Sequence, residues 1–200
     1  MTKLHLGCGP IYLVDGYTNI DLDLPHHHLA SDRPDLVFLN ATTSDNYYKQ
    51  DINRDIIESR VLNQKEVVCD LFADITDLPY FDDSVDEIRL VQVFEHFSYP
   101  EGEALLSIWF DILKSGGMLH IDIPDLDETI RLYANADDEP DRLWARRLLF
   151  GSQKNEWGIH KAMYNKKQIE VLLTDCGYTD ITFLPNIHFY PAFAVEAIKP

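Results

Sequence analysis

An apolar run that breaks abruptly into Gly-x-Gly lies near the start of this chain and limits what it can fold into. Leu4 and Leu6 are followed at once by Gly7, Cys8 and Gly9. Such a run is typical of a buried strand, so we expect an early strand of a central sheet. Two glycines so close together allow backbone torsions and a ligand approach that side chains would block. The opening therefore predicts a strand that ends in a glycine loop, and the alternative is a plain turn.

A second short strand with acids at its end follows the glycine loop. It comprises residues 19–23, Asn-Ile-Asp-Leu-Asp. In open α/β sheets ligands bind beyond the carboxyl ends of the strands, where an acid can accept hydrogen bonds from both hydroxyls of a ribose. Asp21 is the first candidate for that contact. A dinucleotide-binding fingerprint would need a third glycine where Tyr12 stands and an acid about 20 residues further on. A nicotinamide cofactor is therefore disfavoured.

Five blocks of sequence follow one another and together cover most of the chain. They are Leu-His-Leu-Gly-Cys-Gly-Pro (4–10), Asn-Ile-Asp (19–21), Ala-Asp-Ile-Thr-Asp-Leu-Pro-Tyr-Phe-Asp-Asp-Ser-Val-Asp (73–86), Val-Phe-Glu-His-Phe (93–97) and Leu-Lys-Ser-Gly-Gly-Met-Leu-His-Ile-Asp-Ile-Pro-Asp (113–125). In order and spacing they resemble the class I S-adenosylmethionine-dependent methyltransferases. The resemblance implies a single Rossmann-like, three-layer α/β domain over residues 1–200. It also implies a mostly parallel seven-stranded sheet with an antiparallel C-terminal strand, and S-adenosylmethionine as cofactor.

The resemblance further implies which residues bind the cofactor. The set combines the glycine loop with positions on later strands and loops, namely Gly7, Cys8, Gly9, Asp21, Asp74, Ile75 and Gln92. At the position of Asp74 the family's acid accepts a hydrogen bond from the adenine amino group, and the backbone N–H of the next residue, here Ile75, faces the ring. A carboxylate and a backbone donor together distinguish adenine from other bases. The alternatives are that Asp74 only shapes a turn or that Asp77 takes its role.

Glu95 and His96 follow directly on an expected strand at residues 87–94, at the carboxyl end where α/β proteins place functional side chains. Methyl transfer from a sulfonium is a direct displacement, so positioning supplies much of the rate and a general base near the acceptor adds to it. Histidine titrates near neutrality, which makes His96 the first candidate base. Glu95 is the second candidate, and His160 in an aromatic loop is the third. The alternative is a structural role for His96.

Charge and composition exclude some classes of partner. The chain has 34 acids and 17 bases, a formal net charge of −17, and a surface of that sign repels phosphate backbones and anionic lipids. We therefore expect a small-molecule substrate and neither a nucleic acid nor a membrane partner. The densest basic group, Arg142, Arg146, Arg147 and Lys154, is interpreted as the solvated face of a helix. With no apolar run of membrane length and no signal peptide expected, the predicted compartment is the cytoplasm.

The sequence predicts no metal site, although three consecutive histidines leave one as the alternative. Three cysteines, Cys8, Cys69 and Cys176, lie far apart without a Cys-x-x-Cys pair, so neither a disulfide framework nor a zinc site is predicted, and all three are expected to pack. His26, His27 and His28 are consecutive. Adjacent residues of an extended chain point to opposite faces, so these three are expected to form a polar loop near the cofactor.

Residues 24–66 interrupt the expected pattern as an insertion, which either covers the substrate pocket or mediates self-association as a homodimer.

The periodicity of apolar residues predicts further elements along the chain. In chain order these are an extra strand at 36–39, a helix from Ser44 to Leu62, a helix from Pro100 to Gly116, helical structure at 125–150 broken near 137–140, a helix capped by Asn165 and Gln168, and a hairpin of 181–184 with 192–198. In the second half of 125–150, Leu143, Trp144, Leu148, Leu149 and Phe150 are expected to be buried. Few residues separate Gly9 from Asn19, so the usual helix after the glycine loop is expected to be very short or absent.

Together these features favour an enzyme that moves a methyl group to a small polar acceptor, with sugars and glycan precursors among the first classes. The loop Trp157-Gly158-x-His160 looks similar to family members linked to surface-polysaccharide biosynthesis. One alternative is a protein that binds S-adenosylmethionine without turnover, in a regulatory role. A less favoured alternative is an NAD(P)-dependent oxidoreductase.

Overall fold

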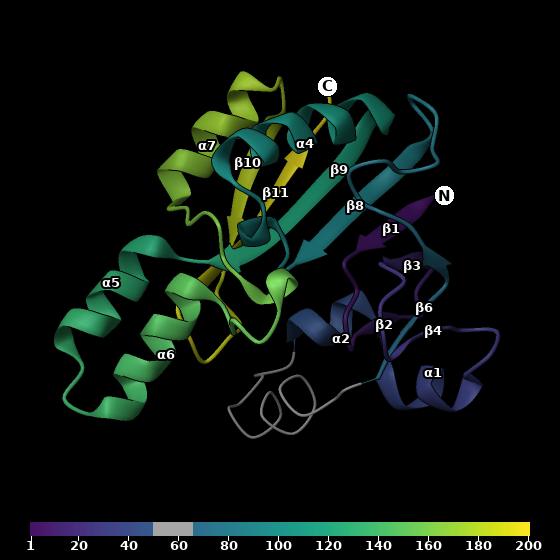
Figure 1. The fold of residues 1–200 in the computed structure, drawn as a ribbon. Coiled ribbons are helices and arrows are strands. Elements are labelled where there is room, and N and C mark those ends of the chain that lie inside the picture. Colours follow the sequence, from purple (N-terminus) through teal and green to yellow (C-terminus); the bar gives the residue numbers. More distant parts are fainter. Residues whose placement is uncertain (50–65) are drawn as a thin grey trace.

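A seven-stranded sheet forms the centre of the structure, a computed structural model that describes residues 1–49 and 66–200 (Figure 1). Its strands are β1 (Lys3–Leu6), β3 (Tyr17–Asp21), β7 (Leu71–Phe72), β8 (Val85–Val91), β9 (Leu113–Pro124), β10 (Thr179–Leu184) and β11 (Ala192–Ile198). They are arranged in the order β10-β11-β9-β8-β1-β3-β7. The pairs from β9 to β7 are all parallel, whereas β11 runs antiparallel to β9 and to β10. The predicted sheet, with its antiparallel C-terminal strand, is confirmed.

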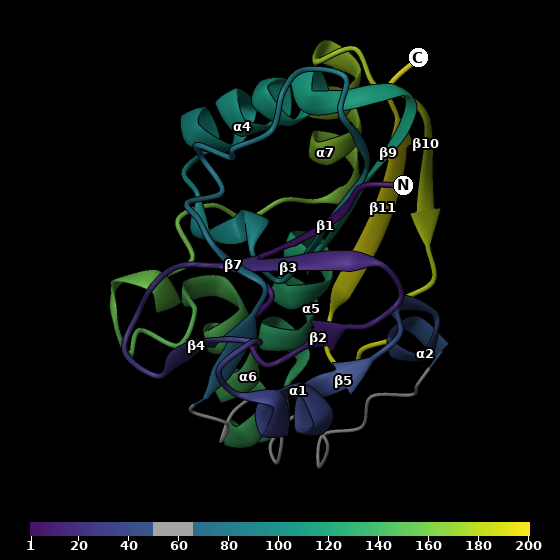
Figure 2. The same cartoon turned by 90° about the vertical axis from the view of Figure 1, so that its right-hand side faces the viewer.

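One face of this sheet is apolar and packs against α4 (Tyr99–Ile112) and α7 (Lys166–Asp175), which lie above it in Figures 1 and 2. The core includes Leu4, Leu6, Ile20, Ile88, Leu90, Leu106, Trp109, Ile121 and Ile169, all of them almost fully buried. The Tyr178 hydroxyl donates to the Leu106 carbonyl at 3.1 Å and joins the end of α7 to α4. The predicted capping box of Asn165 and Gln168 begins α7.

The end of α4 corrects the sequence-based boundary, because the helix stops at Ile112 and not at Gly116. Leu113 has extended torsions, is fully buried, and already pairs with Val85 as the first residue of β9. The register then shifts, so that the next pair joins Glu87 to Met118. Gly116, with φ of +76°, lies in this irregular stretch at the start of the strand. The buried position of Leu113 therefore ends the helix before the glycine pair.

The opposite face of the sheet carries buried polar side chains that satisfy one another. The Glu87 carboxylate accepts hydrogen bonds from the Tyr17 hydroxyl and from Arg89 at 2.9 Å. His5 on β1 and Asn19 on β3 form a side-chain hydrogen bond of 3.1 Å. Buried polar groups are costly unless they find such partners, and each of these five does. His5 is structural, as its place in the first strand suggested.

The segment after β3 begins with short elements that lie below the sheet in Figures 1 and 2. They are β4 (His27–Leu29), α1 (Pro34–Asn40), β5 (Ala41–Thr42) and α2 (Ser44–Lys49); β4 pairs with β6 (Val67–Cys69) and β5 with β2 (Tyr12–Leu13). The strand predicted at 36–39 is wrong, because those residues belong to α1. Pro34 and Asp35 favour a helix start, and only Leu36 and Asn40, four residues apart on one face, are buried.

Two other sequence-based expectations concern the segment that precedes residue 66. The helix predicted from Ser44 begins there as α2, and its remainder, with the predicted apolar positions Ile52, Ile56, Ile57 and Val61, lies outside the described residues. Between Gly9 and β3 the structure contains β2 and no helix, as expected. The glycine loop is therefore not followed by a helix N-terminus that could assist ligand binding.

α5 (Leu126–Asn135) and α6 (Glu139–Phe150) form a helical pair that extends from the carboxyl end of β9 (Figure 1). The predicted break between them is confirmed. Leu148 is buried as expected, but the expected burial is wrong for Leu143 and Phe150, which are 52% and 55% exposed, because α6 turns Ala145 inward together with Leu148. None of the helices within the described residues has the length and apolar character needed to cross a membrane.

Candidate active site

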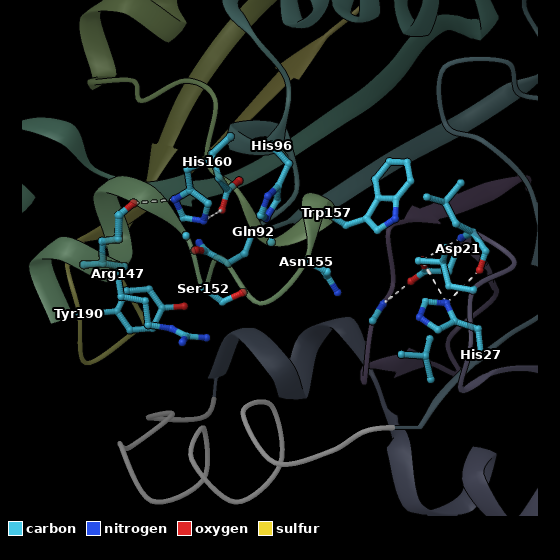
Figure 3. A pocket seen from close by; sticks show the side chains of 18 of the residues that line it. Asp21, His27, Gln92, His96, Arg147, Ser152, Asn155, Trp157, His160 and Tyr190 are labelled. Atoms are coloured by element: carbon cyan, nitrogen blue, oxygen red, sulfur yellow. Dashed lines mark hydrogen bonds and ion pairs between the residues drawn. The ribbon is translucent and has the colours of Figure 1, made fainter. Parts of the chain in front are cut away.

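A cavity of about 430 Å³ lies at the carboxyl ends of the parallel strands, where α/β proteins bind their ligands (Figure 3). Gly9 follows β1, Asp21 ends β3, and Gln92 follows β8 on this wall. The opposite wall comes from α6, from the loop that follows it, and from the connection between β10 and β11. The volume lies in the range of small-molecule sites.

The glycine loop requires its glycines for two separate reasons. Gly7 and Gly9 have φ of +62° and +52°, in the left-handed region that favours glycine. A Cβ atom on Gly7 would also lie 2.7 Å from Cγ2 of Val93, whereas one on Gly9 would meet nothing within 4 Å. Gly7 therefore lets β1 approach the segment after β8, and Gly9 leaves space on the cavity side.

Asp21 lies against this loop, as the sequence predicted. One carboxylate oxygen accepts the Gly9 N–H at 2.8 Å, and the other accepts the Leu22 N–H, also at 2.8 Å. His27 approaches the same carboxylate at 3.6 Å and lines the cavity beside it. These contacts fix the Asp21 side chain at the cavity wall. This position is compatible with the predicted contact to a ribose.

The three consecutive histidines do not share one direction: His27 and His28 lie in the strand β4, and His26 precedes it with φ of +72°. His26 and His28 both approach Glu66, at 3.5 Å and 2.5 Å. His27 points the other way, and its Nδ1 atom lies 2.9 Å from the Leu22 carbonyl. The three rings therefore do not converge on one point, and only His27 reaches the cavity.

Cys8, Asp74 and Ile75 are not among the residues that form the cavity wall. The Asp74 carboxylate accepts hydrogen bonds from the Thr76 N–H at 2.9 Å and the Thr76 hydroxyl at 2.7 Å, which closes its own turn. Ile75 packs in the core, and its carbonyl accepts from the Trp109 ring N–H at 3.2 Å. Burial raises the pKa of the Cys8 thiol well above its usual value. The adenine contacts of Asp74 and Ile75 stay predictions.

The three predicted catalytic candidates do come together at one side of the cavity. Glu95 and His96 lie in a short 3-10 helix after β8 (Phe94–His96), and His160 lies in the loop after α6. The rings of His96 and His160 meet edge to face with centroids 4.8 Å apart, and the His160 Nε2 atom lies 3.9 Å from a Glu95 carboxyl oxygen. Figure 3 shows the two rings beside each other above Gln92.

Burial sets the protonation of these three groups. It raises the pKa of Glu95 to about 8, because the carboxyl group is fully buried and neither oxygen has a hydrogen-bond partner among the described residues. It lowers the pKa of His160 to about 4, with a further contribution from His96, and lowers the pKa of His96 as well. Both imidazoles are therefore neutral near pH 7 and can accept a proton or bind a cation.

Gln92 has a constrained backbone and a fixed side chain. Its φ of +55° is uncommon for a residue other than glycine and recurs at functional sites. Its amide group donates to Asp122 at 2.9 Å, and Asp122 also pairs with His188 at 2.9 Å. Gln92 is thus held at the cavity wall between the glycine loop and the histidine pair.

Sequence reasoning missed the residues at the far end of the cavity. Arg147 is half-buried there, with its guanidinium carbon 6.0 Å from the Trp144 ring centroid, and Trp144 stacks on Tyr190. Burial lowers the pKa of Arg147 below its usual value. The interpretation of this basic cluster as a solvated face holds for Arg146, which is exposed and pairs with Glu139, but is wrong for Arg147. The sequence contained one indication of this contact. Arg147 lies three residues after Trp144, and residues at that spacing are neighbours on one face of a helix.

Comparisons with known proteins agree with this fold. The sequence model of a methyltransferase domain family matches residues 4–121, which run from β1 into β9. A solved structure from Thermotoga maritima, described as a possible histamine N-methyltransferase, shares 14% identity with a TM-score of 0.53, covering 100% of this chain and 82% of that one. Human N-acetylserotonin methyltransferase in complex with S-adenosylmethionine shares 15% identity with a TM-score of 0.54, covering 99% of this chain and 47% of that one.

These two likenesses show a common fold, and the family match extends over more than half of the chain. A search among curated proteins found no match in sequence. The residues present fit the cofactor of this family, because the glycine loop leaves open space at Gly9 and the Asp21 carboxylate lies next to it. The chain belongs to the class I S-adenosylmethionine-dependent methyltransferases.

Proposed function

We propose that this methyltransferase acts on an oxygen atom of a small polar acceptor with one anionic group, of the sugar-phosphate or glycan-precursor class. The observation that carries this proposal is the continuity of one cavity. It joins Gly9 and Asp21, at the cofactor end, to His96 and His160, and then to Arg147 at the far end. A methyl donor and a small acceptor can therefore meet within it.

The cofactor end supplies binding and orientation. S-adenosylmethionine supplies an activated methyl group on a sulfonium, which is displaced as a thioether when the new oxygen–carbon bond forms. Asp21 offers carboxylate oxygens to the ribose hydroxyls, and Gly9 leaves room for the main chain to approach the ligand. Alignment of donor and acceptor supplies much of the rate in such a displacement.

The histidine pair supplies a proton acceptor. The Nδ1 atom of His96 lies 3.0 Å from the Ile159 carbonyl, and that of His160 lies 2.6 Å from the Leu148 carbonyl. Because a carbonyl only accepts hydrogen bonds, each Nδ1 carries the proton and each Nε2 keeps its lone pair. A neutral imidazole in this state can take the proton of an acceptor hydroxyl as the methyl group is transferred.

The far end of the cavity favours an acceptor with one anionic group. Arg147 presents a guanidinium, which binds phosphate and carboxylate groups through paired hydrogen bonds. Trp144 and Tyr190 present aromatic rings that can pack against the apolar face of a sugar. A single arginine can match one anionic group, whereas the net charge of −17 opposes a polyanion such as a nucleic acid.

The experiment is a screen for transfer of a labelled methyl group from S-adenosylmethionine to sugar phosphates, sugar nucleotides and their uncharged analogues. We expect transfer to anionic acceptors, with KM raised at least tenfold in Arg147→Ala. Arg146→Ala is the matched control, because Arg146 is the exposed neighbour on the same helix, and its KM should equal that of the wild type. Equal KM values for the two variants, or transfer only to uncharged acceptors, would contradict the proposed acceptor class. Cofactor binding without any transfer would favour a non-catalytic role.

A further inference from the structure

We propose that Glu95, His96 and His160 form a binding site for one divalent transition-metal ion, of which zinc is the first candidate. Their ligand atoms, one from each side chain, all lie within 4.8 Å of one another. Within residues 1–49 and 66–200 this is the one group of three or more histidine, cysteine or acidic side chains that meets this geometry. The sequence did not predict a metal here, because His160 lies 64 residues after His96.

The Glu95 side chain points to a missing ligand. It is completely buried, and neither carboxyl oxygen has a hydrogen-bond partner among the described residues. A buried carboxyl group without a partner is costly, and proteins satisfy such groups by pairing them or by binding a metal. The Nε2 atom of His160 lies 3.9 Å from one carboxyl oxygen, which is too far for a hydrogen bond.

Both histidines are oriented as metal ligands usually are. Each donates its Nδ1–H to a backbone carbonyl, of Ile159 for His96 and of Leu148 for His160. This second bond fixes the ring and leaves the Nε2 lone pair available, which is the usual arrangement around a metal-bound imidazole. The two imidazoles and the Glu95 carboxyl group, which releases its proton when a metal binds, therefore offer a two-nitrogen, one-oxygen ligand set.

The backbone holds this ligand set together before any ion binds. The Glu95 carbonyl accepts the N–H groups of Lys161 and Ala162 at 2.9 Å and 3.2 Å, which ties the loop of His160 to the segment after β8. Donor atoms of a tetrahedral zinc site lie about 3.4 Å apart, given bond lengths of about 2.1 Å. The ligand atoms, which lie within 4.8 Å of one another, therefore need to approach by at most about 1.4 Å.

Three protein ligands leave at least one coordination position open, which is typical of catalytic metal sites. All three residues line the same cavity as Arg147, so the open side faces the acceptor. A metal there would bind adjacent oxygen atoms of the acceptor, as in a vicinal diol, and lower the pKa of a bound hydroxyl. The metal would then replace the histidines as the group that activates this hydroxyl. This last step rests on the proposed function, whereas metal binding does not.

The test uses the full chain after removal of metals with a chelator. We expect calorimetric titration to show one Zn²⁺ or Co²⁺ per chain, and bound Co²⁺ to give visible absorption bands of a low-coordinate site. Glu95→Gln and His160→Gln should each weaken this binding at least tenfold. His28→Ala is the control, because His28 and Glu66 form a separate histidine–carboxylate pair at 2.5 Å, and neither residue lines the cavity.

The outcomes separate the two proposals. Absence of stoichiometric binding, or binding lost in His28→Ala but kept in His160→Gln, would overturn the metal site. If Glu95→Gln does not fold by circular dichroism, the comparison of His160→Gln with His28→Ala decides. Full methyl transfer by chelator-treated protein that binds no metal would overturn the site and leave the proposed function standing. Stoichiometric metal binding without transfer to any acceptor would support the metal site and overturn the proposed function.

Discussion

Asp21 connects the glycine loop to the cavity through a single side chain. Its two oxygens accept the N–H groups of Gly9 and Leu22, and both have lone pairs left for ribose hydroxyls. We expect Asp21→Ala to weaken S-adenosylhomocysteine binding by roughly 1–3 kcal/mol, the usual cost of leaving polar groups without partners. Isothermal titration measures the change. Asp23→Ala, an exposed acid two residues on, should bind like the wild type. Equal affinities in both variants would remove Asp21 from the site.

His5 predicts how stability depends on pH. Burial, with smaller contributions from Arg89 and His120, lowers its pKa from 6.5 to about 4, against the opposing effect of the hydrogen bond with Asn19. Between pH 6.5 and about 4, the His5 imidazole is therefore protonated in the unfolded chain and neutral in the folded protein. The free energy of unfolding should fall as pH drops through this window, by up to about 3 kcal/mol from His5.

Urea unfolding at several pH values measures this effect. His5→Gln keeps a polar side chain opposite Asn19 but cannot titrate, so its stability should fall less steeply than that of the wild type between pH 6.5 and 4. Above pH 7 the two proteins should differ by a constant amount that reflects packing alone. Parallel profiles at all pH values would show that His5 does not cause the loss.

At the level of single residues, the sequence revealed side chains that follow strand ends and missed those that do not. Asp21, Glu95 and His96 could be found because the carboxyl ends of parallel strands meet at one edge of a sheet. Arg147 and Tyr190 carry no such local signal. One comes from α6 and the other from the connection between β10 and β11, and only the packing of those segments brings them to the cavity.

The loop after α6 depends on one glycine. Gly151 has φ of +76° and ψ of −171°, torsions that only glycine adopts readily, and a Cβ atom there would overlap the Gly158 carbonyl and lie 2.9 Å from the His160 N–H. We expect Gly151→Ala to displace His160, lowering methyl transfer at least tenfold and lowering the melting temperature. Activity and thermal unfolding are the two measurements.

Gly116→Ala provides a matched control for that substitution. Gly116 has the same φ of +76°, but a Cβ atom there meets nothing within 4 Å. The residue lies near the start of β9 and does not line the cavity. It should cost only the left-handed strain, about 1–2 kcal/mol, and leave kcat unchanged. A Gly151→Ala variant as active as Gly116→Ala would show that the loop tolerates the change.

Helices and strands were predicted correctly where the local sequence pattern and the tertiary packing agree. The predictions failed where the two differ. The α7 capping box and the break between α5 and α6 follow from the residues themselves. The strand expected at 36–39 failed because four consecutive apolar residues fit either element, and Pro34 with Asp35 decided for a helix. The end of α4 failed because the burial of Leu113 depends on its partner strand, which a local pattern does not contain.

For the molecule as a whole, cofactor binding should appear as added stability. A ligand that binds only the folded state stabilises it by about 2.7 kcal/mol at 100 times its Kd. For a chain of this size that corresponds to a rise of roughly 5–10 °C in Tm. We expect S-adenosylmethionine and S-adenosylhomocysteine to produce this shift in differential scanning fluorimetry, and NAD to produce none because Tyr12 replaces the third fingerprint glycine. A shift with NAD alone would contradict the assigned cofactor.

The helical pair α5 and α6, with the loop that follows, lies after the segment shared with the family model, which ends at residue 121. If the proposed function is right, donor recognition resides in one part of the gene product, and the side chains that choose between acceptors reside largely in another. Such a division would make the enzyme modular. Grafting residues 125–164 from a relative should exchange what is methylated while the methyl source stays the same.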